Sequence, residues 1–150
     1  MRLDELLVQR ELCADLHDAR ASIMAGEVVV GEHRATSAGM RVTDDTAVRL
    51  KEGKRRGGFV SRGGLKLQRA LDVFAIDVTG LSCVDLGASS GGFTDCLLQR
   101  GAAHVSAVDV GAGQFDWGLR NDTRVSLFER TNIRNVTADD IGGPFDLAVA

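Results

Sequence analysis

A glycine-rich stretch at residues 83–94 carries residue types that could bind a nucleotide-like ligand. It reads as a short apolar strand with an acid, Asp85, near its end, followed by a bend and the start of a helix. Gly87 can adopt a positive φ, a conformation that is unfavourable for residues with a Cβ atom. Gly91 and Gly92 would let a ligand approach the main chain where the first N–H groups of the helix lack partners. The stretch therefore predicts a pocket at the carboxyl end of a parallel strand.

The spacing of the small residues indicates which ligand this pocket would bind. A dinucleotide fingerprint is G-x-G-x-x-G, but residue 89 is Ser rather than Gly. The side chain of a serine at this position hinders the close approach of a pyrophosphate to the main chain. A second acid, Asp109, closes the apolar run 104–108 about 20 residues further on, where a carboxylate can bind both ribose hydroxyls. An adenosyl ligand without phosphates fits this pair of acids, which points to S-adenosylmethionine. The alternative is a tight strand–helix turn with no ligand.

The composition is that of a globular protein, with 44% hydrophobic residues and a net charge of −3 over 150 residues. No apolar run approaches the ~20 residues that a transmembrane helix needs. Acids at Asp4 and Glu5 stand where a signal peptide would begin its apolar region, so we expect a cytoplasmic protein. Cys13, Cys83 and Cys96 show no C-x-x-C spacing, which indicates a reducing compartment and predicts no metal site.

The first 58 residues predict a small α+β module with a basic linker. Helical spacing of apolar residues covers 2–12, and a second helix follows with Asp15 as its N-cap and Gly26 as its end. Short strands follow at 28–30, 41–42 and 47–50. The linker carries a cluster of cations, which could neutralise phosphates or form a solvated connection; it comprises Lys54, Arg55, Arg56 and, just beyond, Arg62.

Strands and helices alternate from residue 59 to residue 150, which predicts a parallel, doubly wound sheet. The first helix of this part would bury Leu67, Leu71 and Phe74 on one face. The last strand of this part would be 145–150.

Residues 2–7 and 19–28 resemble the alpha-L RNA-binding motif of a small-subunit ribosomal protein. In that family, two helices and the following hairpin form a surface for structured RNA. The resemblance implies RNA contacts from Arg2, Arg10 and Arg20 beside the linker cations. The chain departs from the motif at 15–16, 31–32 and 37–38, where usual cations and turn residues are replaced, so RNA affinity from this module alone should be modest.

Five segments together resemble the TlyA family, which joins an alpha-L module to an FtsJ-like methyltransferase: residues 60–67, 85–95, 109–111, 116–122 and 129–132. The resemblance covers essentially the whole chain. It implies a Rossmann-like class I methyltransferase domain at 59–150 and ribosomal RNA 2′-O-methylation of cytidines with S-adenosylmethionine. The cofactor-binding residues it implies are Asp85, Gly87, Ala88, Ser89, Gly91, Gly92, Phe93, Asp109, Val110 and Asn132.

The resemblance also implies a catalytic Lys-Asp-Lys-Glu tetrad around the ribose hydroxyl, and Lys66 matches its first lysine. By sequence pattern alone, Lys66 would be an exposed helix lysine. The other three members and about three strands of the sheet would lie beyond residue 150, so the fold is expected to be incomplete at its C-terminus. The resemblance also implies that the strand at 145–150 lies beside the strand at 83–86 and leaves an apolar edge through which the chain could associate with itself. We therefore expect this 150-residue form to be inactive as a methyltransferase. The alternative function is a non-catalytic RNA-binding or ribosome-associated protein with a vestigial cofactor half-site.

Overall fold

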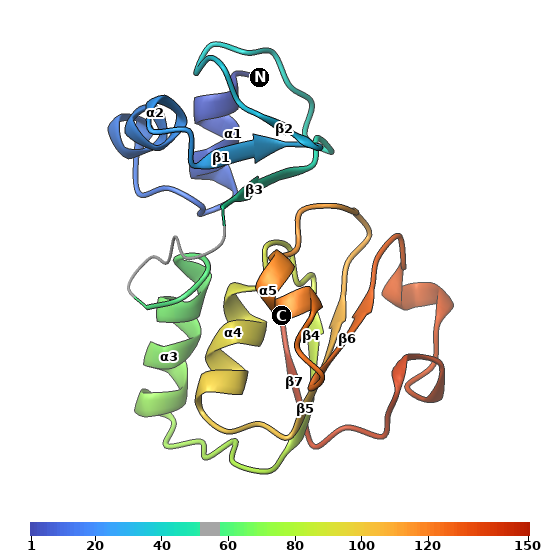
Figure 1. The fold of residues 1–150 in the computed structure, drawn as a ribbon. Coiled ribbons are helices and arrows are strands. Elements are labelled where there is room, and N and C mark those ends of the chain that lie inside the picture. Colours follow the sequence, from blue (N-terminus) through green and yellow to red (C-terminus); the bar gives the residue numbers. More distant parts are fainter. Residues whose placement is uncertain (52–57) are drawn as a thin grey trace.

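The computed structural model describes residues 1–51 and 58–150, which form two sheets flanked by helices (Figure 1). The N-terminal sheet is antiparallel, with the strand order β2-β1-β3. The elements of this unit are α1 (Leu3–Gln9), α2 (Leu16–Met24), β1 (Val28–Val30), β2 (His33–Arg34) and β3 (Val48–Leu50).

The N-terminal unit forms around a core of leucine and valine side chains. Leu3, Leu6 and Leu7 from α1 are fully buried against β1 and β3. The helix α2 begins where Asp15 accepts a hydrogen bond from the Asp18 N–H at 2.8 Å, which confirms the predicted N-cap. Arg41 forms only an isolated bridge with Arg2 rather than the predicted strand at 41–42, because residues 43–46 fold into a hydrogen-bonded turn.

The second sheet is parallel and has the strand order β6-β5-β4-β7, which confirms the predicted α/β class for this part of the chain. Its elements, in chain order, are α3 (Gly63–Val73), β4 (Ser82–Leu86), α4 (Gly92–Gln99), β5 (His104–Val108), α5 (Trp117–Arg120), β6 (Val125–Phe128), the 3₁₀ turns η1 (Ile133–Asn135) and η2 (Asp139–Ile141), and β7 (Leu147–Val149).

The direction of the strand order reverses at β4. The chain adds β5 and β6 on one side of β4 and then returns to place β7 on its other side, where Val84 pairs with Ala148. The pairing of the last strand, β7, with β4 was predicted. In open parallel sheets, ligands bind outside the carboxyl ends of the strands at such a reversal, and here that point follows Asp85.

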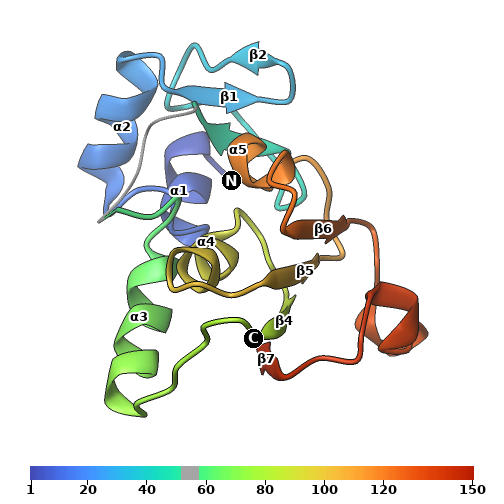
Figure 2. The same ribbon diagram turned by 60° about the horizontal axis from the view of Figure 1, so that its bottom comes forward.

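Helices α3 and α4 cover one face of the parallel sheet, and the segment between β6 and β7 covers the other (Figures 1 and 2). Leu67 and Leu71 are buried in the helical layer as predicted. The prediction for Phe74 is wrong, because this side chain is 72% exposed. The helix ends at Val73, and Ala75 takes a left-handed φ of 52°, which turns the chain away from the core.

No helix in the described ranges, 1–51 and 58–150, is both long enough and apolar enough to span a membrane.

Candidate functional site

A cavity of about 350 Å³ opens at the carboxyl end of β4, beside the reversal of strand order. Its walls come from the glycine-rich loop, from the start of α3 and from the end of α1. The lining residues are Gln9, Arg10, Glu11, Ser61, Gly63, Lys66, Asp85, Gly87, Ala88, Ser89, Ser90, Gly92, Phe93 and Ala150. The structure therefore brings together the predicted catalytic lysine and six of the ten predicted cofactor-binding residues.

The glycine-rich loop is shaped by left-handed residues and by backbone hydrogen bonds. Gly87 has φ +82°, and its N–H donates to the Val108 carbonyl at 2.8 Å. A Cβ on Gly87 would meet no atom within 4 Å, so the positive φ rather than lack of space requires glycine. Ser89 is also left-handed, with φ 50°, a conformation that is unfavourable for a residue with a side chain.

Gly91 and Gly92 were predicted to let a ligand approach the main chain, but both glycines lie against other parts of the protein. A Cβ on Gly91 would lie 2.7 Å from Cδ1 of Leu119, next to α5. A Cβ on Gly92 would lie 2.2 Å from Oγ of Ser61, before α3. The close approach that these glycines permit therefore includes packing of α5 and of the 61–64 segment, and the sequence pattern did not indicate these neighbours.

Asp109 is fixed in place by the loops on both sides of it. Its Oδ2 accepts the Ser89 N–H at 2.8 Å, and its Oδ1 accepts the Gly111 N–H at 2.8 Å and the Gln114 side-chain amide at 3.2 Å. The carboxylate does not line the cavity itself but lies one hydrogen bond behind Ser89, which does. A carboxylate offers about four acceptor positions, so one remains for a ligand hydroxyl.

Asp85 is the other acid of the loop and is almost completely buried, with 1% of its surface exposed. Its Oδ2 accepts a hydrogen bond from Oγ1 of Thr94 at 2.7 Å. Burial raises the pKa of Asp85 to about 6, although the Thr94 hydrogen bonds oppose this effect and the nearby charge of Asp109 adds to it. An acid with a perturbed pKa at the base of a cavity is typical of a functional site.

Replacing Asp85 by asparagine should change how stability depends on pH. Because the pKa rises on folding from 3.8 to about 6, the protonated carboxyl favours the folded state below pH ~4, and this contribution is lost as the pH rises through ~6. At about 1.4 kcal/mol per pKa unit, ionisation costs at most about 3 kcal/mol at pH 7. In the absence of ligand, Asp85→Asn should therefore unfold at higher urea concentration than the wild type at pH 7, and less so at pH 4.

A suitable contrast for this experiment is Asp122→Asn. The pKa of Asp122 is lowered by hydrogen bonds from Arg124, so its loss should reduce stability at neutral pH rather than increase it. Identical pH profiles for Asp85→Asn and the wild type would show that the Asp85 carboxyl carries no unfavourable charge in the folded protein.

Lys66 lies on α3 at the mouth of the cavity and forms an ion pair with Glu11 of the N-terminal unit. The Arg62 N–H donates to the Glu11 carbonyl at 3.1 Å, so main-chain and side-chain contacts both join the two units here. Glu11 follows the last turn of α1 with φ 58°, in the left-handed position where helices usually place glycine. Sequence spacing gave no signal for this pair, whose members are 55 residues apart.

The comparisons with known proteins identify the family of this chain. The FtsJ-like methyltransferase family matches residues 59–150, which is more than half of the chain. The chain belongs to the FtsJ-like methyltransferase family. Residues 59–150 include the glycine-rich loop, Lys66 and both acids of the site.

Individual relatives place this FtsJ-like chain beside the TlyA proteins. It is 49% identical over 149 residues to the 16S/23S rRNA (cytidine-2′-O)-methyltransferase TlyA of Mycobacterium tuberculosis, covering 99% of this chain and 55% of that protein. Hemolysin A of Brachyspira hyodysenteriae is 38% identical over 139 residues, covering 93% of this chain and 57% of its own.

A solved structure supports the same relationship. A hemolysin-like protein from Streptococcus thermophilus is similar with a TM-score of 0.64 at 42% identity, covering 99% of this chain and 54% of its own. The predicted resemblance to the TlyA family is thus confirmed. The chain spans about half the length of the relatives that it matches.

The acceptor groups of the site suit the cofactor that an FtsJ-like methyltransferase implies. The cavity volume falls in the usual range for small-ligand sites. Asp85 lines the cavity and Asp109 lies one hydrogen bond behind its wall, so both carboxylates are placed to accept hydrogen bonds from a ligand or to lie near its positive charge. S-adenosylmethionine carries a ribose and a positive sulfur, so the residues present fit it.

Three predicted cofactor-binding residues do not line the cavity, in addition to Asp109. Gly91 faces α5, as described above. Val110 is 71% exposed. Asn132 is exposed and accepts the Arg134 N–H at 3.0 Å, which makes it the N-cap of η1. A cofactor role for these three stays a prediction.

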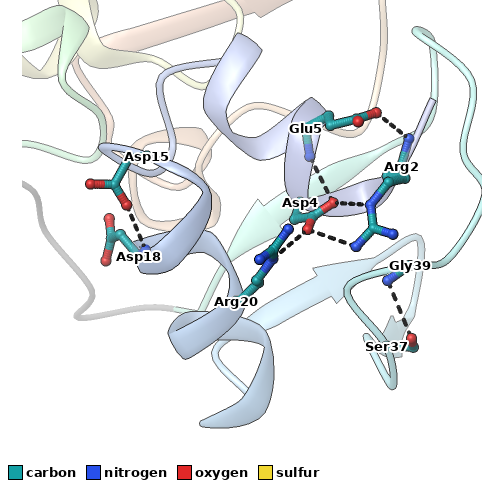
Figure 3. A network of polar contacts seen from close by, with 8 residues as sticks. All are labelled: Arg2, Asp4, Glu5, Asp15, Asp18, Arg20, Ser37 and Gly39. Carbon is teal, nitrogen blue, oxygen red and sulfur yellow. Dashed lines mark hydrogen bonds and ion pairs between the residues drawn. The ribbon is translucent and has the colours of Figure 1, made fainter.

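The predicted RNA-binding arginines of the N-terminal unit are held by acceptors inside it. Arg2 and Arg20 both bind Asp4, whose carboxylate is fully buried, with Nε–Oδ distances of 2.9 Å (Figure 3). These arginines hold the pKa of Asp4 well below its usual range. Their side chains are still 43% and 52% exposed, so each can present charge to solvent.

Arg10 is also held by acceptors of its own unit. Its guanidinium donates to the carbonyls of Asp44 and Thr46, and the residue lines the cavity. Burial lowers its pKa. Arg62 is exposed at the start of α3, whereas Lys54, Arg55 and Arg56 lie outside the described residues. RNA binding by these six arginines and one lysine stays a prediction.

Proposed function

We propose that this chain provides the cofactor-binding part of an rRNA 2′-O-methyltransferase, with residues 59–150 as the methyltransferase part and residues 1–58 as an RNA-binding module with its linker. The observation that carries this proposal is that Lys66 and the loop from Asp85 to Phe93 line one cavity at the reversal of the parallel sheet. These residues belong to different elements, and a shared cavity is what transfer between a bound cofactor and a bound hydroxyl needs.

The residues that would hold S-adenosylmethionine follow from the site. Asp109, fixed by three donors, would accept hydrogen bonds from the ribose hydroxyls, and Gly87 and Ser89 would offer main-chain atoms beside them. Asp85 would stabilise positive charge in the ligand, since it lies at the buried end of the cavity wall. When bound, S-adenosylmethionine supplies a methyl group on a positively charged sulfur.

Lys66 would act on the acceptor. A ribose 2′-hydroxyl is a weak nucleophile, so an enzyme gains rate by orienting its oxygen and by stabilising negative charge as the proton leaves. The Lys66 ammonium lies at the cavity mouth, with its side chain 64% exposed, where an RNA strand could reach it. For this role the lysine would exchange its Glu11 partner for the ribose oxygen.

The acceptor class is proposed from the relatives. The Mycobacterium tuberculosis relative is named for acting on the 2′-oxygen of cytidine in 16S and 23S rRNA. We propose ribosomal RNA in the cytoplasm as the substrate of this chain too, with half-exposed Arg2 and Arg20 contributing to its affinity.

Titration of the 150-residue chain with S-adenosylmethionine, followed by isothermal titration calorimetry, tests the proposal. We expect saturable binding at one site, and we expect NAD to bind at least tenfold more weakly. The loop has Ser89 where a dinucleotide site needs a glycine for close approach of the pyrophosphate.

The opposite result would decide between the functions considered above. Absence of S-adenosylmethionine binding by a folded chain that still binds rRNA fragments would reject the cofactor site. It would favour the non-catalytic RNA-binding protein instead. Tighter binding of NAD would reject both the ligand class and the reaction.

A further inference from the structure

A second cavity, of about 490 Å³, lies between the three-stranded sheet and α5. Its lining includes Glu32 and Arg49 from the N-terminal unit and Phe115, Trp117 and Arg120 from the FtsJ-like part. Figure 2 shows α5 beside the three-stranded sheet. None of these residues has a role in the proposed cofactor site, so this cavity requires an explanation of its own.

Trp117 is the feature of this cavity that a folded protein would not ordinarily expose. It is 54% exposed, although Leu119, two residues later on α5, is buried. The Arg120 guanidinium lies 5.9 Å from the centre of the indole ring and so covers one face of it. Since more than half of the side chain is exposed nonetheless, the uncovered part of the ring is open to a ligand.

Hydrogen bonds hold the residues that surround the Trp117 ring in place. Arg120 is held by Glu129 through two hydrogen bonds, of 2.7 and 3.2 Å. Asp116 caps α5 by accepting the Leu119 N–H at 3.0 Å. A rigid aromatic ring loses little conformational entropy when another flat ring stacks on it, which suits recognition rather than core packing.

The N-terminal sheet adds positive charge on the opposite wall. Val29 of β1 pairs with Arg34 on one side and with Arg49 on the other, so the two arginines lie on the same face of the sheet. Arg49 lines the cavity, and no other residue within 1–51 or 58–150 forms an ion pair with it. Glu32 also lines the cavity, and the charge of Arg120 is already paired with Glu129, so Arg49 is the cation placed there to contact a phosphate.

We propose that this cavity binds an unpaired ribonucleotide, whose base stacks on Trp117 and whose phosphate contacts Arg49. An exposed aromatic ring opposite a cation is the arrangement by which proteins bind single-stranded RNA. The inference rests on the proposed function for its choice of RNA. It adds a subsite apart from the reaction cavity, to which α5 connects it because Leu119 and Phe115 pack against Gly91 of the cofactor loop.

The chain offers a direct probe of this site, because Trp117 is its only tryptophan and it contains no tyrosine. We expect a single-stranded cytidine oligonucleotide to quench the fluorescence of the intact chain, since a stacked base alters the emission of the indole. An RNA duplex of the same length should quench it much less, because its bases are already stacked. Anisotropy of labelled RNA measures the affinity independently.

Substitutions separate the stacking and the charge. Trp117→Ala should weaken single-strand binding about 5- to 150-fold, and Trp117→Phe should weaken it less. Arg49→Gln should reduce the slope of log affinity against log salt by about 0.7, the value for one phosphate of a single strand. Arg69→Gln removes the same charge from an exposed position on α3, outside this cavity, and should leave the slope nearly unchanged.

Unchanged fluorescence at RNA concentrations that saturate the anisotropy signal would overturn the inference, as would equal affinity for Trp117→Ala. Equal quenching by duplex and single strand would also overturn it, since an unpaired base would then not be the ligand. The measurement needs no cofactor, so it fails or succeeds separately from the proposed function. Quenching by RNA in a chain that does not bind S-adenosylmethionine would reject the methyltransferase proposal and retain the nucleotide subsite.

Discussion

The affinity for S-adenosylmethionine is expected to fall about ten- to hundredfold when Asp109 is replaced by alanine. The carboxylate is oriented by the N–H groups of Ser89 and Gly111 and by the side chain of Gln114. A ligand hydroxyl that donates to it forms a charge-assisted hydrogen bond, whose loss costs about 1.5–3 kcal/mol. Isothermal titration calorimetry of both proteins measures the difference.

Two controls separate ligand contact from loss of loop structure. Asp122→Ala removes another carboxylate that accepts a backbone N–H, that of Arg124 at 2.9 Å, but Asp122 lies outside the cavity. It should leave the cofactor affinity unchanged. An adenosyl analogue without ribose hydroxyls should bind the wild type and Asp109→Ala with similar affinity, because the contact in question is then absent from both complexes. Full affinity of Asp109→Ala for S-adenosylmethionine would reject the ribose contact.

The parallel sheet and its loop could be predicted because their signals are local. A buried strand and a glycine at a tight turn can be recognised in a short window of sequence, and the turn forms as predicted at Gly87. An acid at the end of the next apolar run can be recognised in the same way, and Asp109 lies there, beside the loop. Pairing of β7 with β4 followed from the resemblance to a known fold, and the structure confirms it. The prediction from local periodicity was wrong for Phe74, because α3 ends one residue before it and the side chain is exposed.

The residues that the N-terminal unit contributes to the two cavities could not be predicted from the sequence, because they depend on how the two units dock. Arg10 and Arg49 each line a cavity whose other wall lies in the FtsJ-like part. Arg2 and Arg20 were predicted to contact RNA, and the structure shows that both also bind the buried carboxylate of Asp4. The contacts of Arg20 with Asp4 and of Lys66 with Glu11 join residues 16 and 55 positions apart, so no short window of the sequence contains them.

The second large effect is expected at Lys66, and it concerns the rate of methyl transfer rather than cofactor affinity. The assay uses a chimaera in which residues 1–150 are followed by the remaining part of the Mycobacterium tuberculosis relative, whose own length is about twice that of this chain. Lys66→Ala should lower kcat about 10²- to 10⁴-fold, the usual contribution of a group that manages a proton in the transition state. Transfer of tritiated methyl groups to ribosomal subunits measures kcat.

Calorimetry of the same variant should show a dissociation constant for S-adenosylmethionine within a few fold of the wild type. Lys66 lies at the cavity mouth, and the acids assigned to the cofactor lie on the loop. A loss of kcat with cofactor binding intact would assign the lysine to the acceptor. A parallel loss of cofactor affinity would instead place Lys66 in the cofactor site.

Glu11→Gln provides the control that decides between a catalytic and a structural lysine. The ion pair with Glu11 joins the two units, so Lys66→Ala could reduce the rate merely by loosening their contact. Both side chains are partly exposed, at 64% and 36%, and pairs of this kind contribute about 0–1 kcal/mol to stability. Glu11→Gln removes the pair but keeps the ammonium, so it should retain methyl transfer within a few fold. If Glu11→Gln instead lowers kcat as much as Lys66→Ala does, then Lys66 acts through the contact between the units, and its assignment to the ribose hydroxyl is wrong.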